Sequence, residues 1–170
     1  MAISIYDQSI AAMSRALSSL AAIVAKAEAH ADEQGIEHAA LLNARLFPDM
    51  HSLIKQIQIA SDTAKGGAAR LAGVDAPSWE DDETSFAQLR ARIQKTLDFL
   101  AGFEPESLEG AESREVEIKF TGGSVKMDGK SHLLGFVLPN LYFHVTTAYN
   151  ILRHNGVAIG KRDYLGSPGN

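Results

Sequence analysis

Polar side chains recur at helical spacing in the segment LPNLYFHVTTAYNILRHNG, residues 138–156. On a helix, Asn140, His144 and Thr147 fall on one face, four and then three residues apart. An imidazole can accept a proton or bind a metal ion, and the amide and hydroxyl beside it are neutral donors and acceptors. The spacing therefore predicts either the wall of a small, weakly charged pocket or a buried network in which every polar atom has a partner.

The other possible sites in the sequence are weaker. No Ser/His/Asp spacing and no phosphate-binding glycine loop occurs, and GKRDYLG lacks both the preceding strand and the spaced glycines of such a loop. Five further histidines are interpreted as exposed or as placed at helix ends and turns: His30, His38, His51, His132 and His154.

Charged residues on helices that should pack together form a second group. Buried ion pairs among them would fix packing register more often than they would catalyse a reaction. We expect a structural role for this group, which comprises Arg45, Asp49, Asp62, Arg70 and Arg153.

Apolar residues three and four apart predict long helices on either side of these groups. The first helix ends near Gly35 and the second opens after Pro48 and Asp49; Gly66 and Gly67 within it suggest that another backbone passes close by. The stripes are Ile10, Met13, Leu17, Leu20 and Val24 in the first helix, Leu53, Ile57, Ala60 and Ala64 in the second, and Phe86, Leu89, Ile93, Leu97 and Leu100 in the third.

The connections have their own signatures. The acidic stretch at about residues 74–83 is a solvated connection, after which Asp82 or Thr84 can cap the third helix. Alternating apolar and charged residues predict a hairpin over about 114–128. The stretch from His132 to His154 is helical, Pro139 marks a kink or a fresh helix start, and the glycine-rich tail at 156–170 is irregular.

These elements predict one domain, residues 1–170, that is mainly α: a four-helix bundle with a small β-hairpin inserted between the third and fourth helices. The net charge of −5 argues against a nucleic-acid partner. The absence of cysteine excludes disulfides and thiolate catalysis and fits a reducing compartment. Charged residues interrupt the apolar N-terminus, so we expect no membrane span and a cytoplasmic location.

Three blocks together resemble an uncharacterised bacterial family, a domain of unknown function within the DinB/YfiT-like four-helix-bundle superfamily. They are RLFPDMHSLIKQIQIASDTAKGGAARLAG, WEDDETSFAQLRARIQKTLDFL and LPNLYFHVTTAYNILRHNGVAIGKRDYLG. The resemblance spans nearly the whole chain and implies the DinB-like fold, without an established activity.

The resemblance also implies where a metal would bind, since the superfamily often holds a divalent ion with one histidine from the second helix and an HxxxH pair from the last. Here His144 resembles the first histidine of that pair, Ala148 stands in the second position, and Gln56 stands on the second helix. Two of three ligands are thus replaced, and one imidazole is a weak site for a divalent ion. We expect no metal cofactor.

Two functions remain open. The first is a non-catalytic bundle, a homodimer with a polar small-molecule pocket around His144, lined by Gln56, Asn140, Thr147 and Tyr149. The second, implied by the resemblance, is a transferase or hydrolase of the DinB/YfiT type, with or without metal, that acts on a small molecule or thiol with His144 as base. In the first case His144 is mostly buried, neutral and bonded beside Asn140, Thr147 or Gln56. A two-fold dimer is expected because it is the commonest soluble assembly, and because the small residues around Ala60 to Ala69 would allow two helices to approach closely.

Overall fold

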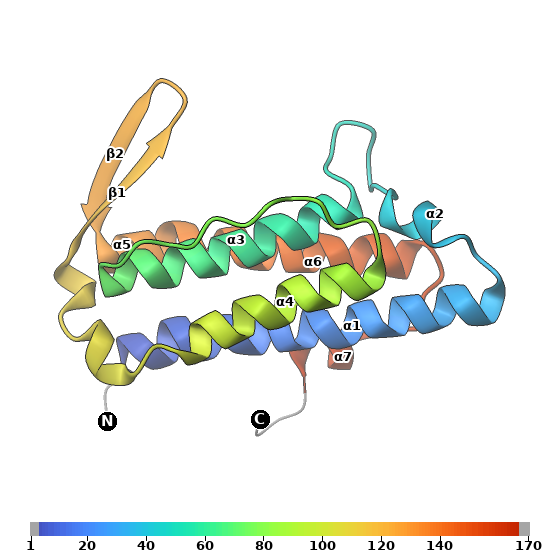
Figure 1. The fold of residues 1–170 in the computed structure, drawn as a ribbon, viewed down its shortest axis with the longest axis horizontal. Helices are drawn as coiled ribbons and strands as arrows, with labels where there is room; N and C mark the ends of the chain where they lie inside the picture. Colours follow the sequence, from blue (N-terminus) through green and yellow to red (C-terminus); the bar gives the residue numbers. More distant parts are fainter. Residues whose placement is uncertain (1–3, 167–170) are drawn as a thin grey trace.

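The computed structural model describes residues 4–166 and consists of four long helices and one hairpin. The long helices are α1 (Ala12–Gln34), α3 (Leu53–Ala72), α4 (Phe86–Ala101) and α6 (Leu138–His154). They form a ring in which α3 packs on α4 and α6, and α1 packs on the same two helices (Figure 1). The predicted mainly α bundle, with a hairpin between the third and fourth long helices, is confirmed.

Shorter elements join the long helices. They are the helices α2 (His38–Leu42), α5 (Gly129–His132) and α7 (Lys161–Leu165), the 3-10 turns Pro105–Leu108 and Ala111–Ser113, and the π-helical turns Asp7–Ala11 and Leu133–Val137.

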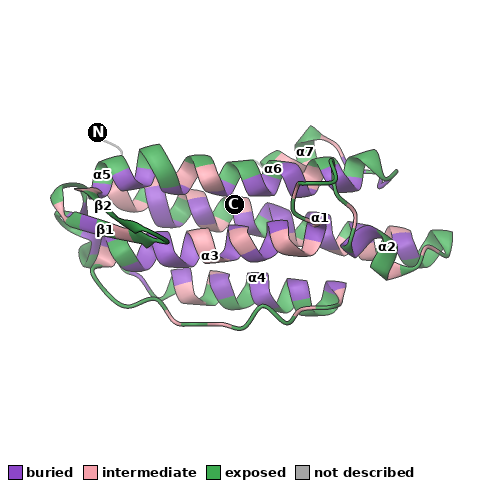
Figure 2. Ribbon diagram, turned by 90° about the horizontal axis from the view of Figure 1, so that it is seen from above, coloured by how far each residue is buried: buried purple, intermediate pink, exposed green. Residues whose placement is uncertain are grey.

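The core lies along the axis of the bundle, where the apolar stripe of each long helix meets the others (Figure 2). Leu17 and Leu20 of α1, Ile57 of α3 and Ile93 of α4 are completely buried, and each such side chain contributes roughly 1.5–3 kcal/mol to folding. The N-terminal helical run Asp7–Gln34 is long and apolar enough to cross a membrane by length and composition. Its apolar residues face the other helices, as they do in the core helix of a bundle.

Helices α3 and α4 run in the same direction, so the chain must return along the bundle between them (Figure 1). Residues 74–85, which we call the strap, make this crossover without helix or strand. Bundles with one long crossover of this kind are known alongside simple up-and-down bundles.

One predicted helix end agrees with the structure and two helix starts differ. Gly35 ends α1 as predicted, with φ at +64°, a conformation that favours glycine. Helix α3 begins at Leu53 instead of after Pro48, because the N–H of Leu53 bonds the carbonyl of Ala44 and closes the preceding loop. The cap of α4 is Ser85 instead of Asp82 or Thr84: its hydroxyl accepts from the backbone N–H of Gln88.

The hairpin pairs β1 (Glu115–Phe120) with β2 (Gly123–Asp128) in an antiparallel register. Cross-strand partners share a face of the sheet, so one face is apolar and the other is charged. Only the base of the hairpin contacts the bundle, through α5, and the rest projects from it (Figure 1). The apolar face carries Val116 opposite Met127, Ile118 opposite Val125, and Phe120 opposite Gly123.

Pro139 lies in the first turn of α6, immediately after the π-helical turn Leu133–Val137. A proline has no N–H to donate, so it is tolerated where a new α-helical segment begins. Helical structure therefore continues from Gly129 to His154 but changes its pitch before Pro139.

The glycine-rich tail is only partly irregular, contrary to the prediction, because it contains α7. The carboxylate of Asp163 accepts from the backbone N–H of Gly160 at 2.7 Å and pairs with Lys26 of α1 at 2.6 Å. These two contacts define the helix start and hold it against α1. Residues 167–170 of the predicted tail lie outside the described residues.

The glycine pair of α3 accommodates side chains instead of the backbone that was predicted. A Cβ on Gly67 would lie 2.6 Å from Cγ1 of Val137, and one on Gly66 would lie 2.8 Å from Nη1 of Arg70. Gly67 thus allows α3 to approach the π-helical turn before α6 closely.

Candidate functional site

Gln56 of α3 and His144 of α6 meet across the seam between these helices. The imidazole Nδ1 lies 2.7 Å from Oε1 of Gln56, and Nε2 of Gln56 donates to the carbonyl of His51 at 3.0 Å. The bond to His51 identifies Oε1 as the acceptor oxygen of the amide, so Nδ1 of His144 must be the donor. The neutral ring therefore carries its proton on Nδ1 and keeps a lone pair on Nε2.

Burial keeps this ring neutral. Only 8% of the surface of His144 is exposed, and burial, together with the nearby charge of His51 when protonated, lowers the pKa of His144 below its usual value. Nε2 of His144 has no hydrogen-bond partner in residues 4–166, yet it is not among the fully enclosed unpartnered atoms. Nε2 is thus an acceptor that the bundle does not fully enclose.

Two other predicted pocket residues have separate partners. Asn140 donates to the hydroxyl of Thr63 at 2.8 Å, and the hydroxyl of Thr147 donates to the carbonyl of Phe143 at 2.7 Å. Both side chains lie on the predicted face of α6, but neither bonds His144. Their bonds join α6 to α3 and to the preceding turn of α6.

Tyr149 is not brought to His144. Five residues further along the helix, it lies about 140° around the axis, and its ring packs edge-to-face on Tyr164 of α7, with ring centres 6.2 Å apart. Its place against α7, on the side of α6 that faces α1, excludes it from a cluster with Gln56.

The donors around His144 do not fit a divalent-metal site. Ala148, one turn after His144, is buried and has no donor atom, and Oε1 of Gln56 already accepts from Nδ1. Residues 4–166 contain no group of three or more His, Asp or Glu side chains placed to hold an ion. That the protein uses no metal stays a prediction.

A second buried histidine lies near the C-terminal end of α3. His132 is completely buried, stacks on Phe136 with ring centres 5.9 Å apart, and has no partner for either ring nitrogen in the described chain. Burial, and secondarily the charge of Arg70, lowers the pKa of His132 to about 4. It was predicted from the sequence to be peripheral, because it directly follows the hairpin.

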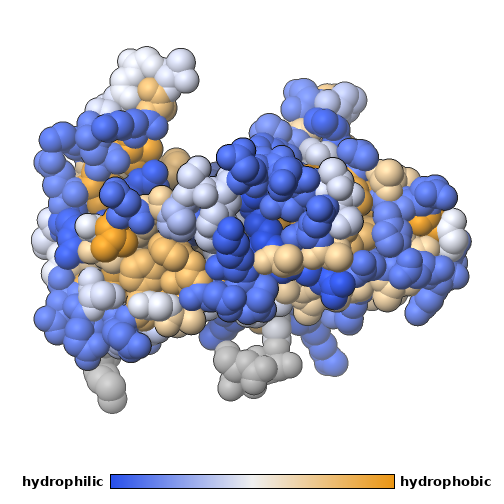
Figure 3. Space-filling view, in the orientation of Figure 1, coloured by the Kyte–Doolittle hydropathy of each residue, from blue (hydrophilic) through white to orange (hydrophobic). Residues whose placement is uncertain are grey.

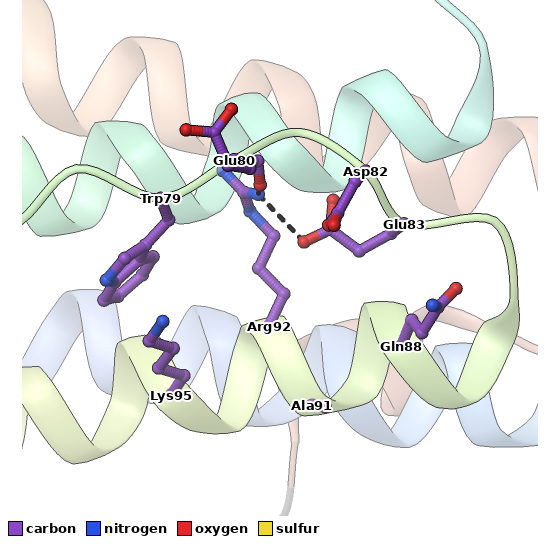
Figure 4. Close-up of a pocket in the computed structure, with 8 residues that line it drawn as sticks. All are labelled: Trp79, Glu80, Asp82, Glu83, Gln88, Ala91, Arg92 and Lys95. Carbon is purple, nitrogen blue, oxygen red and sulfur yellow. Dashed lines mark hydrogen bonds and ion pairs between the residues drawn. The ribbon is translucent and has the colours of Figure 1, made fainter.

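A cavity of about 370 Å³ lies under the strap, on the side of α4 (Figure 4). Its volume is within the range of small-molecule sites, but Arg92 and Glu83 in its wall are already paired with each other. The lining residues are Trp79, Glu80, Asp82, Glu83, Gln88, Ala91, Arg92 and Lys95.

Arg92 fixes the strap to both helices beneath it. Its buried guanidinium bonds the carbonyl of Glu80 and the carboxylate of Glu83, each at 2.9 Å, and pairs with Asp62 at 3.1 Å and Asp81 at 2.9 Å. Burial alone would lower the pKa of Arg92, but these carboxylates hold that pKa above its ordinary value.

The same network lowers the pKa of acidic side chains in the strap. Burial alone would raise the pKa of Glu83, but hydrogen bonds from Arg92 and Gln58 hold that pKa below its usual value. Next along the strap, the ring of Trp79 lies 4.3 Å from the ammonium of Lys65 and 4.7 Å from that of Lys95. These contacts explain why a segment without helix or strand follows one path.

Only part of the predicted ion-pair group forms. Asp62 pairs with Arg92 and Lys65, whereas the side chains of Arg70 and Asp49 have no ion pair among residues 4–166. Arg92 itself was missed. Its signal was an arginine on the apolar stripe of the third helix, three residues after Leu89, preceded by the acids of the strap.

Comparison with known proteins agrees with this fold. The family model described as "Domain of unknown function (DUF1993)" matches residues 5–165. The crystal structure of a DinB family member protein from Shewanella denitrificans is similar with a TM-score of 0.91 and 43% sequence identity, covering 98% of this chain and 94% of that one. No curated protein matches. The chain therefore belongs to the DUF1993 family of domains of unknown function and has the fold of the DinB proteins.

Proposed function

We propose that this DinB-like protein is a cytoplasmic homodimer that binds a small molecule at His144 without a metal ion. The observation that carries the proposal is the bond between Nδ1 of His144 and Oε1 of Gln56, 2.7 Å long. It fixes one tautomer and leaves Nε2 as an acceptor. Nε2 of His144 is not fully enclosed, unlike both ring nitrogens of His132.

The chemistry of the ligand follows from this acceptor. A neutral imidazole with a lowered pKa accepts a hydrogen bond from a hydroxyl, thiol or protonated acid. The ring centre of Phe143 lies 5.3 Å from that of His144, and exposed His51 is near enough for its charge to lower the pKa of His144. The ligand is therefore a small molecule with one donor beside an apolar part.

The cytoplasmic location rests on the cysteine-free composition, which needs no oxidising compartment.

A thermal-shift screen of the purified protein tests the binding proposal, with 2-mercaptoethanol, cysteine, acetic acid and lactic acid as probes. A ligand that binds only the folded state raises its unfolding temperature. The expected result is a shift with at least one probe that is lost in His144→Gln but kept in His154→Gln, a change at an exposed histidine of the same helix. An equal shift in both variants contradicts the site.

Unfolding of His144→Gln without added probe tests how much the bond between His144 and Gln56 contributes to stability. His144→Gln disturbs a buried bond, and we expect the free energy of unfolding to fall by about 1–3 kcal/mol. Elemental analysis of the protein as purified is a separate check: a stoichiometric divalent ion that disappears in His144→Gln would overturn the metal-free site.

An enzymatic function of the DinB/YfiT type, as a transferase or hydrolase, is the second candidate. It is favoured by the free lone pair on Nε2, which can take the proton of a thiol or of water as that group attacks an electrophile. Thiol transfer to 1-chloro-2,4-dinitrobenzene releases chloride, and hydrolysis of 4-nitrophenyl acetate releases nitrophenolate. Turnover in either assay that His144→Gln abolishes would identify an enzyme, and its absence leaves binding as the function.

A further inference from the structure

The strap is attached to the bundle without any share in its core. Among residues 4–166, the stretch 75–84 makes no backbone-to-backbone hydrogen bond, and no residue of the strap is buried or belongs to the apolar core. Figure 3 shows hydrophilic residues across the middle of the face along which the strap runs in Figure 1. Burial of apolar side chains is the dominant favourable term in folding, so the strap lacks the interaction that holds the helices together.

Two carboxylates of the strap make its hydrogen-bonded and ionic contacts with both helices. Arg92 of α4 binds the side chains of Asp81 and Glu83, each at 2.9 Å. Lys55 of α3 pairs with Asp81 at 2.5 Å, and Gln58 of α3 donates to Glu83 at 2.8 Å. We call these four contacts the latch. Because they all end on two side chains, a small change in the strap can break them together.

The rest of the strap packs loosely on the helices. The ring of Trp79 lies 4.3 Å from the ammonium of Lys65 and 4.7 Å from that of Lys95, and Figure 4 shows it pointing towards α4 beside Lys95. Such contacts at partly exposed sites contribute little. A cavity of about 370 Å³ remains between this part of the strap and α4. The strap is therefore not close-packed on the helix that it crosses.

Both ends of the strap are closed by helix caps that do not depend on the latch. At the end of α3, the N–H of Val74 bonds the carbonyl of Ala69, and at the start of α4, Ser85 accepts from the N–H of Gln88. Helix α3 has 20 residues and is about 30 Å long, whereas a segment from 74 to 85 can extend to about 40 Å. The strap is thus long enough to leave the helices without displacing their ends.

We propose that the strap is a cover that opens as a unit when the latch breaks, while the four long helices stay folded. Local opening of this kind belongs to segments with few buried apolar contacts. Gln58, Lys65 and Arg92 are buried in the closed form, and each contacts a residue of the strap. Opening exposes these three side chains to water, so the closed strap is an acidic segment that covers a polar and mainly cationic strip of its own chain.

Trp79 reports the position of the strap, because it is the only tryptophan of the chain. Acrylamide quenching of its fluorescence measures how open the strap is, and far-UV circular dichroism measures the helices. In D81N/E83Q we expect the ratio of open to closed strap to rise at least about tenfold, since hydrogen bonds to charged groups each contribute about that factor or more. Quenching then rises in buffer without denaturant, and the helical signal stays that of the wild type.

E80Q/D82N is the matched control, because it removes the same number of charges from the same strap. Neither carboxylate has an ion pair among residues 4–166, and Glu80 meets Arg92 only through its backbone carbonyl. We expect this variant to keep the quenching of the wild type. Equal quenching in the two double variants would show that the latch does not hold the strap and would overturn the proposal.

Urea titration of the wild type and of D81N/E83Q completes the test. A separate opening predicts that Trp79 in D81N/E83Q becomes accessible at lower urea concentration than the one at which the helical signal is lost. Coincident transitions of the two probes in both proteins would mean that strap and bundle unfold as one unit, which contradicts the proposal. Loss of the helical signal of D81N/E83Q in buffer would also overturn it, because the latch would then hold the bundle and not the strap alone.

Discussion

His144 and His132 lie on one helical run and are both buried, but the hydrogen bonding of their ring nitrogens differs. Gln56 bonds the first and leaves one nitrogen at the edge of the bundle, whereas the second is enclosed with no partner for either nitrogen. Sequence spacing predicted the first but not the second, because His132 follows a hairpin and its burial depends on how that hairpin docks. The meeting of His144 with Gln56 was suggested only by family resemblance, since residues 88 positions apart carry no local signal.

His132 should make the protein sensitive to acid. Its pKa is about 4 in the folded chain, against about 6.5 for an unperturbed histidine. The unfolded chain therefore binds a proton in this window that the folded chain does not, and folding stability falls as the pH drops from about 6.5 towards 4. The difference corresponds to about 3 kcal/mol.

Replacing His132 with leucine removes both this proton and two buried unpartnered nitrogens. In His132→Leu we expect the free energy of unfolding to be equal or higher at pH 7 and to stay nearly flat between pH 6.5 and 4. Urea titrations across this range measure it. His154→Gln, at the exposed end of α6, should keep the slope of the wild type; a slope retained in His132→Leu would show that another group causes it.

At the scale of elements, the apolar period predicted the long helices and the alternation predicted the hairpin. Both patterns are local in the sequence, so the packing of other segments does not change the elements that they predict. The predicted start of α3 and the predicted irregular tail were wrong because the actual structure depends on a contact with another segment, as Asp163 makes with Lys26. The cap of α4 is a local contact of Ser85 with Gln88, but Asp82, Thr84 and Ser85 are all residue types that can cap a helix. The path of the strap was not predictable either, since Arg92 was taken as an ordinary helix residue.

Arg92 should carry much of the stability of the strap. Arg92→Leu leaves Asp62, Asp81 and Glu83 without their shared cation, and we expect a loss of about 3–5 kcal/mol in urea denaturation. Arg90→Leu is the matched control. Arg90 makes one half-exposed pair with Glu28 at 2.7 Å, a kind of pair worth at most about 1 kcal/mol. Equal losses in the two variants would refute the anchoring role.

The contact between α3 and the turn before α6 depends on Gly67. Gly67→Ala places a Cβ 2.6 Å from Cγ1 of Val137, so Val137 must shift, and we expect a loss of about 1–3 kcal/mol. Gly135→Ala, in the adjoining turn with no atom within 4 Å of its Cβ, should be neutral or stabilising by up to about 1 kcal/mol. Thermal unfolding of both variants measures the contrast, and a stabilising Gly67→Ala would argue against close packing here.

The whole molecule is a DinB-like bundle in which Nε2 of His144, on the seam of α3 and α6, is not fully enclosed. Its helices, hairpin and class were predictable from the sequence because they follow from patterns repeated over many residues. The network of Arg92 was not predictable, because its partners Asp62, Asp81 and Glu83 come from α3 and the strap, which only the fold brings to α4.

The central claim is that the folded protein holds His144 as a neutral ring with Nδ1 protonated and Nε2 free. Long-range ¹H–¹⁵N correlation spectra of the intact protein report this directly, through the chemical shifts of both ring nitrogens and their change with pH. We predict an Nδ1–H tautomer and a pKa below 6.5, with the tautomer preference lost in Gln56→Leu. A ring protonated on Nε2, or one that titrates at or above 6.5, would contradict the account.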